Sequence, residues 1–153
     1  MIEKLTGESY YDYVRENVFK PAGMSDTDSY ELDKLPPNTA IGYMKKGTPD
    51  RIPNTAAQPA RGSSAGGGYS TAPDLLKFAN ALRDGKLSIP SDDGTIPAAF
   101  TGTGIAGGSE GVNAVFVSST KNGYTVIVLS NYDPPSAEQP SMIVRDWIKE
   151  IAQ

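Results

Sequence analysis

The chain has 153 residues, which suffices for one domain with a single core, and its 14 Lys and Arg against 18 Asp and Glu make it mildly acidic. This charge balance argues against electrostatic binding of nucleic acid or of an anionic membrane surface. The chain has no cysteine and no histidine, which excludes disulfides, thiol catalysis, a Ser-His-Asp triad and the usual zinc sites, so we expect neither a metal nor another cofactor.

The sequence shows no recognisable targeting or membrane-spanning segment. There is no run of about eighteen apolar residues, and Met1 is followed by I-E-K rather than by a basic and then an apolar segment. We therefore expect neither a membrane span nor a targeting segment in this chain. A cysteine-free sequence is compatible with either cytoplasm or periplasm, so the compartment stays open.

The N-terminal segment is expected to be helical. Residues 2–5 resemble the end of a helix, with Gly7 at the position of a left-handed cap. Ser9 can cap a second helix through about Phe19, which the sequence K-P-A-G at residues 20–23 ends. Apolar and aromatic residues recur along it at helical spacing, and we interpret its tyrosines as core and boundary residues rather than as a proton relay. These tyrosines are Tyr10, Tyr11 and Tyr13.

Residues 31–68 lack sustained periodicity and contain five prolines, which predicts an ordered loop or excursion. A complete helix-start pattern follows, with Thr71 as N-cap, Pro73 in the first turn and Asp74 closing a capping box. The helix is expected to end near Gly85. Its apolar face is formed by Leu75, Leu76, Ala79 and Leu82.

From Phe100 onward the pattern becomes that of strands. Residues 112–119 and 124–131 are expected to form a hairpin, because an Asn-Gly pair at residues 122–123 lies between two β-rich runs. The second run is apolar on both faces, which predicts a strand covered on both sides.

Residues 136–153 are expected to form a C-terminal helix that packs on the sheet through Trp147. Pro140 either bends its first turn or delays its start to Ser141. The predicted apolar stripe consists of Ile143, Val144, Trp147, Ile148 and Ile151.

Helices, then an antiparallel sheet, then a packed helix indicate an α+β fold class. We expect one domain over residues 1–153. Its helical part would cover residues 1–90, with the excursion at 31–68, and its sheet and final helix would cover residues 99–153.

Three short motif matches lack the structural context that their chemistry needs. Residues 62–66 spell the nucleophile elbow G-x-S-x-G, but the chain has no histidine partner and no strand precedes them, so we favour a flexible loop. Residues 102–107 spell G-x-G-x-x-G, yet a β-run rather than a helix follows. Residues 118–121 spell Ser-x-x-Lys at the end of a strand, which favours a solvated turn over a helix-start nucleophile.

Taken in order, three blocks resemble a known family. G-E-S-Y-Y-D-Y-V-R-E-N-V-F-K-P-A-G-M at residues 7–24, G-G-G-Y-S-T-A-P-D-L-L-K-F at residues 66–78, and the closing hairpin and helix are similar to the C-terminal half of the serine hydrolases related to class C β-lactamases, DD-peptidases and penicillin-binding-protein-like esterases. The resemblance covers most of the chain except residues 31–60 and 87–100. It implies a partial β-lactamase/transpeptidase-like fold with a three-stranded antiparallel sheet.

The resemblance also implies an acyl-serine mechanism. In this family, a Ser-x-x-Lys helix and a Tyr-x-Asn loop precede the block that begins here at Met1, so this chain is expected to hold no catalytic residue of its own. The third family motif, usually Lys-Thr-Gly or His-x-Gly, maps onto Ile105, Ala106 and Gly107, with Gly108 beside them, as the lining of the substrate pocket. An aliphatic residue at the first position disfavours β-lactam binding and suits an esterase or a peptidase-like hydrolase better. In this isolated chain we favour plain strand and turn for residues 105–108, since half of any site is missing.

Two functions from different classes follow. One is the C-terminal portion of a serine hydrolase whose parent cleaves a small-molecule ester or amide, inactive as this chain alone. The other is a non-catalytic binding or structural domain that kept the scaffold. An upstream reading frame that encodes Ser-x-x-Lys and then Tyr-x-Asn would distinguish them.

The resemblance further implies that the strand at residues 124–131 is flanked by strands of the family's N-terminal segment. We therefore expect the isolated chain to self-associate through that edge, or to cover it with part of the 31–68 excursion. The family resemblance suits a periplasmic or extracellular location, which no residue decides.

Overall fold

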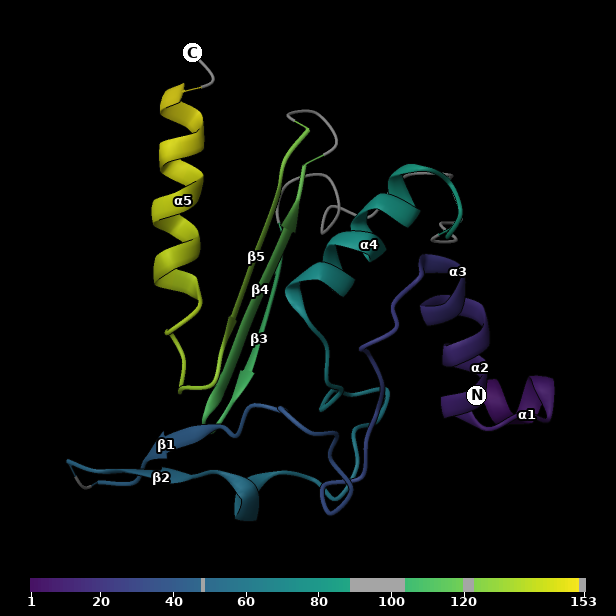
Figure 1. Cartoon of the computed structure of the whole chain (residues 1–153), viewed down its shortest axis with the longest axis horizontal. Coiled ribbons are helices and arrows are strands. Elements are labelled where there is room, and N and C mark those ends of the chain that lie inside the picture. The colour runs from purple at the N-terminus through teal and green to yellow at the C-terminus, as the bar shows by residue number, and fades with distance from the viewer. Residues whose placement is uncertain (48, 89–103, 120–122, 152–153) are drawn as a thin grey trace. The chain divides into compact units, whose positions relative to one another are not determined.

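The computed structural model describes residues 1–47, 49–88, 104–119 and 123–151. The chain forms two compact units, Met1–Pro37 with Pro59–Pro90, and Asn38–Gln58 with Ser91–Gln153. Figure 1 shows helices in the first unit, and a three-stranded sheet with a long helix in the second. One domain over residues 1–153 stays a prediction.

The first unit begins with helices whose ends follow the sequence signals. Helix α1 (Ile2–Thr6) ends at Gly7, which has the left-handed φ of 77°. Helix α2 (Tyr10–Val14) is capped by Ser9, whose hydroxyl accepts from the Asp12 N–H at 3.1 Å. Both caps are confirmed.

The second helix extends beyond its predicted end. After α2, the chain continues through one turn of π-helix, η1 (Arg15–Phe19), into the short helix α3 (Lys20–Ala22), and it stops at Gly23, with φ 74°. Pro21 lies in the first turn of α3. Since a wider π-turn shifts the backbone hydrogen-bond pattern there, proline's missing N–H does not end the helix at Phe19 as predicted.

Helix α4 (Ala72–Arg83) starts as predicted but uses its acidic residue differently. Thr71 Oγ1 accepts from the Asp74 N–H at 3.2 Å, so the N-cap is confirmed. Asp74 is fully buried, and its carboxylate accepts from the Asp26 N–H at 2.7 Å and the Thr27 hydroxyl at 2.8 Å. The carboxylate also pairs with Lys77. Asp74 therefore joins α4 to the chain after α3.

The first unit consists of two stretches of chain, residues 1–37 and 59–90, which pair with each other near the point where residues 38–58 leave for the second unit. Asp28 and Tyr69 exchange backbone hydrogen bonds of 3.1 and 2.9 Å, and the Leu32 N–H donates to the Ala60 carbonyl at 2.8 Å. The two ends of the predicted excursion therefore lie side by side.

The second unit contains the predicted antiparallel sheet, in the order β3 (Ile105–Ser109), β4 (Val112–Ser118), β5 (Thr125–Ser130). Three strands and the β4–β5 hairpin are confirmed. Residues 120–122 of its turn, including Asn122, lie outside the described residues. The prediction that β5 is covered on both faces fails at Leu129, which is 44% exposed.

The core of this unit lies between the sheet and helix α5 (Glu138–Ile151). Buried valines of β4 and β5 pack with Ala137, which precedes the helix; Figure 1 shows α5 running alongside the sheet. The buried cluster consists of Val115, Val117, Val126 and Ala137, with Tyr124, Val128 and Ile148 packed against it. Pro140 lies in the first turn of α5, where its missing N–H leaves no helical bond unmade.

The predicted role of Trp147 is wrong. Its neighbour Ile148 packs against the core, whereas Trp147 is 63% exposed, and Ile143 and Ile151 are each 70% exposed. Successive helix residues are about 100° apart around the axis, so the broad apolar stripe cannot face the sheet along its whole width. The side with Ser141 and Ile148 is the one that meets it.

Part of the excursion forms a small sheet that the sequence analysis missed. Strands β1 (Tyr43–Lys45) and β2 (Arg51–Pro53) pair antiparallel, and a 3-10 turn, η2 (Thr55–Ala57), follows. The Tyr43 N–H donates to the Asn131 carbonyl at 2.8 Å. The excursion thus meets the chain just beyond the end of β5.

Candidate functional site

The predicted pocket lining lies on an edge strand. All residues of β3 are exposed, and Ile105 is paired with Phe116 of β4. Within the described residues, β3 has a neighbouring strand on one side only. An edge strand presents free backbone N–H and C=O groups, which can hydrogen-bond an extended ligand. The structure therefore places Ile105, Ala106, Gly107 and Gly108 together on an accessible edge.

The two adjacent glycines of β3 have different surroundings. A Cβ atom added at Gly107 would meet no atom within 4 Å. At Gly108 it would lie 2.8 Å from Pro134 Cγ and 2.9 Å from Asn113 Nδ2. Gly108 therefore permits close packing within the unit, whereas Gly107 leaves open space beside the strand.

The turn between β3 and β4 is held by side chains from the excursion. Asn54 Nδ2 donates to the Glu110 carbonyl at 2.9 Å, and Gln58 Nε2 donates to the same carbonyl at 3.2 Å. Asn54 is buried, and a Cβ atom at Gly111 would lie 2.8 Å from its Cβ. The small sheet of residues 43–53 and the chain after it thus fix one end of β3.

Asp133 is a second anchor of this turn. Its carboxylate accepts from the Gly111 N–H at 2.8 Å and from the Lys45 N–H at 2.9 Å, and Arg51 lies 3.7 Å away. The N–H groups of Lys45 and Gly111 hold the pKa of Asp133 below its ordinary value, because they stabilise the ionised carboxylate. This anchor was not predicted from the sequence, although an Asp shortly after a strand and before two prolines is a recognisable turn signal.

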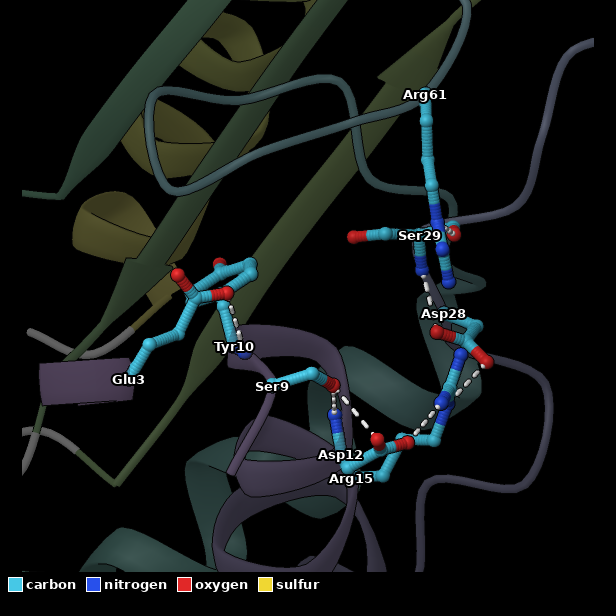
Figure 2. Close-up of polar contacts among 8 residues, drawn as sticks. All are labelled: Glu3, Ser9, Tyr10, Asp12, Arg15, Asp28, Ser29 and Arg61. Atoms are coloured by element: carbon cyan, nitrogen blue, oxygen red, sulfur yellow. Dashed lines mark hydrogen bonds and ion pairs between the residues drawn. The ribbon is translucent and has the colours of Figure 1, made fainter. Parts of the chain in front are cut away.

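The first unit has a polar cluster around α2, drawn in Figure 2. The Arg15 guanidinium lies between two carboxylates, 2.8 Å from Asp12 Oδ1 and 2.7 Å from Asp28 Oδ2. Ser9 Oγ donates to Asp12 Oδ2 at 2.6 Å. The hydrogen bond from Arg15 to Asp28 raises the arginine's pKa further. Every charged group in this chain of contacts is paired, which indicates a structural clasp rather than a reactive site.

The three tyrosines of α2 show no relay geometry. Tyr10 and Tyr11 make an edge contact with ring centroids 5.3 Å apart, and the Arg61 guanidinium stacks 3.5 Å from the centroid of Tyr11. Arg61 also donates to the Ser29 carbonyl at 2.7 Å (Figure 2). Tyr11 therefore acts as a packing surface for Arg61.

The G-x-S-x-G match at residues 62–66 forms a tight hairpin. Ser63 and Gly66 exchange backbone hydrogen bonds of 2.7 and 3.0 Å. Gly62 lies against the returning chain, since a Cβ there would be 2.3 Å from the Gly67 carbonyl oxygen. Helix α4 begins only at Ala72, so this is not the strand-turn-helix of a nucleophile elbow. A paired turn replaces the predicted flexible loop.

The other two motif matches lie partly outside the described residues. From Gly104 onward, the glycine match at 102–107 continues into β3, with no helix N-terminus to receive a phosphate. In the match at 118–121, Ser118 ends β4 and its hydroxyl lies 3.3 Å from that of Thr125. Among the described residues of these motifs, 105–107 lie in β3 and Ser118 ends β4, and none begins a helix.

Across residues 1–47, 49–88, 104–119 and 123–151, no three His, Cys, Asp or Glu side chains gather as metal ligands. In the same ranges no helix is both long and apolar enough to span a bilayer.

Two proteins similar to this chain are longer than it is. The "Putative penicillin-binding protein PbpX" of Bacillus subtilis (strain 168) is 29% identical over 145 residues, and the match covers 84% of this chain and 36% of that protein. The crystal structure of a penicillin binding protein from Bacillus halodurans superposes with a TM-score of 0.81 at 24% identity, over 96% of this chain and 52% of that one. The chain thus spans about a third to a half of the length of these proteins.

The fold and the family agree with the three sequence blocks. The superposition shows that the α+β arrangement is that of a penicillin-binding-protein-like fold. A family model described as Beta-lactamase matches residues 1–148, nearly the whole chain. The chain therefore belongs to the Beta-lactamase family.

Proposed function

We propose that this chain is the C-terminal portion of a serine hydrolase that cleaves an ester or an amide through an acyl-serine intermediate. In that reaction, a serine Oγ attacks the carbonyl carbon, and a base takes its proton and passes it to the leaving group as the C–O or C–N bond breaks. Water then hydrolyses the acyl-serine. The serine and its base would belong to Ser-x-x-Lys and Tyr-x-Asn elements outside this chain.

The observation that carries the proposal is the exposed β3 edge in a chain of this family. We assign Ile105, Ala106, Gly107 and Gly108 to the substrate pocket, where the backbone of β3 would bind the extended part of the substrate. The open space at Gly107 supports this assignment. Ile105 offers no cation for a substrate carboxylate, so a neutral ester suits this edge better than a penicillin does.

Ligand titration followed by NMR tests the pocket. We expect millimolar phenyl acetate to shift the amide signals of residues 105–108, and benzylpenicillin to shift them less. Gly107→Val places a branched side chain in the open space beside the strand, where an added Cβ meets no atom within 4 Å, and should abolish the phenyl acetate effect. Ser109→Val, an exposed position on the same strand, is the matched control and should leave the effect intact. Equal shifts with both ligands, or shifts elsewhere only, would contradict the assignment.

Covalent labelling tests the absence of a nucleophile. Incubation with a fluorophosphonate or a fluorescent penicillin should give no adduct in the intact mass of this chain, while an active class C β-lactamase is labelled in parallel. Ser63 lies in a tight turn, where its hydroxyl accepts a hydrogen bond from the Ala65 N–H. Ser118 is buried beside Thr125. A stoichiometric adduct on Ser63, Ser64 or Ser118 would overturn the proposal.

The competing function is a non-catalytic binding or structural domain. It would be favoured if neither ligand shifts β3 while the chain self-associates. The free edge of β5 supports self-association: within the described residues, backbone hydrogen bonds from outside the sheet reach Asn131 but none of residues 125–130. Among the described residues, the excursion thus pairs with the chain at Asn131, just beyond the end of β5, and not along the strand itself.

A further inference from the structure

A buried amide links the candidate substrate strand to the final helix. Asn113 of β4 is 3% exposed, and its side chain lies in the row of Val115 and Val117 that faces the core. Its Nδ2 donates to the Gly107 carbonyl at 3.0 Å and to Glu138 Oε1 at 3.1 Å. Its Oδ1 accepts from the Ala137 N–H at 2.7 Å. One side chain therefore touches β3, the start of α5 and the residue before it.

Both donor hydrogens of this amide and one acceptor direction of its oxygen are used. The two Nδ2 hydrogens have one acceptor each, and Oδ1 has a donor, so the side chain has a single favourable orientation. An amide in an otherwise apolar row is unfavourable unless it is fully paired. Because Gly108 has no Cβ, the strand can approach Asn113 this closely.

Glu138 fixes the orientation of Asn113. Its Oε1 accepts from Nδ2, which makes the bond charge-assisted and stronger than one between neutral groups. Its other oxygen, Oε2, is buried with no hydrogen-bond partner among the described residues. A buried carboxylate oxygen without a hydrogen bond is unfavourable, so packing alone does not account for it. The arrangement is explained if the bond to Asn113 has a role beyond stability.

We propose that Asn113, oriented by Glu138, is a positioning residue that sets the β3 backbone at Gly107 and Gly108 for substrate binding. The inference rests on the proposed pocket at residues 105–108. Asn113 acts through the Gly107 carbonyl and does not touch the substrate. Glu138 acts one step further away, by holding the amide so that Nδ2 faces β3.

Three variants of the full chain separate this role from simple packing. Asn113→Asp keeps an oxygen for the Ala137 N–H but removes both donors, so it breaks the link to Gly107. Glu138→Gln keeps an acceptor for Asn113 and is the conservative control. Glu138→Ala removes only the anchor of Asn113, and it carries the test if Asn113→Asp fails to fold.

The readouts without ligand are the 13C shift of the Gly107 carbonyl and the amide exchange of β3. We expect Asn113→Asp and, more weakly, Glu138→Ala to move the carbonyl shift and to speed exchange at residues 105–109 by about tenfold, with residues 115–117 unchanged. Glu138→Gln should resemble the wild type. An unchanged Gly107 signal in both disruptive variants, or a uniform increase in exchange across the sheet, would overturn the proposal.

A ligand measurement separates this inference from the proposed function. If phenyl acetate does not perturb β3 in the wild type, the pocket assignment fails, and with it the claim that Asn113 positions substrate. The effect of Asn113 on the β3 backbone is measured separately, without ligand. If the wild type binds, we expect Asn113→Asp to weaken phenyl acetate about tenfold, in line with the loss of one hydrogen-bonded contact. A shifted Gly107 signal with unchanged affinity would show that the link is structural only.

Discussion

The two adjacent glycines of β3 are predicted to differ in how much stability the protein loses when each is replaced by alanine. In Gly108→Ala the new Cβ would lie 2.8 Å from Pro134 Cγ, 2.9 Å from Asn113 Nδ2 and 3.1 Å from the Val112 carbonyl oxygen. Carbon atoms in contact prefer about 3.5 to 4.0 Å, so the strand or Pro134 must move by nearly an ångström. Overpacking of this kind destabilises by about 1 to 3 kcal/mol. A loss of about 2 kcal/mol would lower the Tm by roughly 4 to 8 °C in a chain of this size.

Gly107→Ala is the matched control. Its Cβ would meet nothing within 4 Å, and alanine restricts the unfolded chain more than glycine does. We therefore expect no loss, or a gain of about 0.4 to 1 kcal/mol. Urea and thermal unfolding followed by far-UV circular dichroism measure both variants. Equal stability of the two variants, or a loss in Gly107→Ala as large as in Gly108→Ala, would refute the packing described for β3.

Three further outcomes are expected. Ile148→Ala should destabilise by about 2 kcal/mol, and more than Trp147→Ala does, because only Ile148 packs on the core; a larger loss at Trp147 in urea unfolding would contradict this docking. Burial alone would raise the pKa of Asp74, but hydrogen bonds from Lys77, Thr27 and the Asp26 N–H outweigh it and keep the pKa below the ordinary 3.8. Because the pKa is lower in the folded state, Asp74 contributes stability above about pH 4 that is lost as the pH falls further. The unfolding free energy of Asp74→Asn should therefore fall less steeply with decreasing pH than that of the wild type. The same pH dependence in both proteins would argue against this role of Asp74. Light scattering over a concentration series should show self-association, with slow amide exchange at residues 125–130; a strict monomer with fast exchange along β5 would exclude an occupied edge.

Local signals in the sequence were sufficient for several elements. Several features depend only on residues a few positions apart: the left-handed Gly7, the N-caps Ser9 and Thr71, and the alternation of the β4–β5 hairpin. Such short-range interactions depend little on the rest of the fold, so the sequence alone predicts them. The order of the three sequence blocks was likewise enough to identify the family.

The candidate site could be predicted only in part. The sequence located Ile105–Gly108 on a strand by resemblance, and the structure places that strand at an edge with open space beside Gly107. The sequence could not indicate that the Asn113 side chain contacts both Gly107 of that strand and Glu138 of α5. These contacts join residues 6 and 25 positions apart on three different elements, and no local pattern specifies such a meeting.

What only the tertiary structure decided is the choice among equivalent local options. The sequence determined that α5 is amphipathic, but Ile148 rather than Trp147 meets the core because the axis of the helix sets which part of a broad stripe faces the sheet. Asp74 has the spacing of a capping-box acid, yet its carboxylate binds Thr27, 47 residues away. The strands β1 and β2 have three residues each, too few for a periodic signal. In each case, long-range packing and the need to pair buried polar groups outweigh local preference, because the free energy of burial depends on the partner that the rest of the fold supplies.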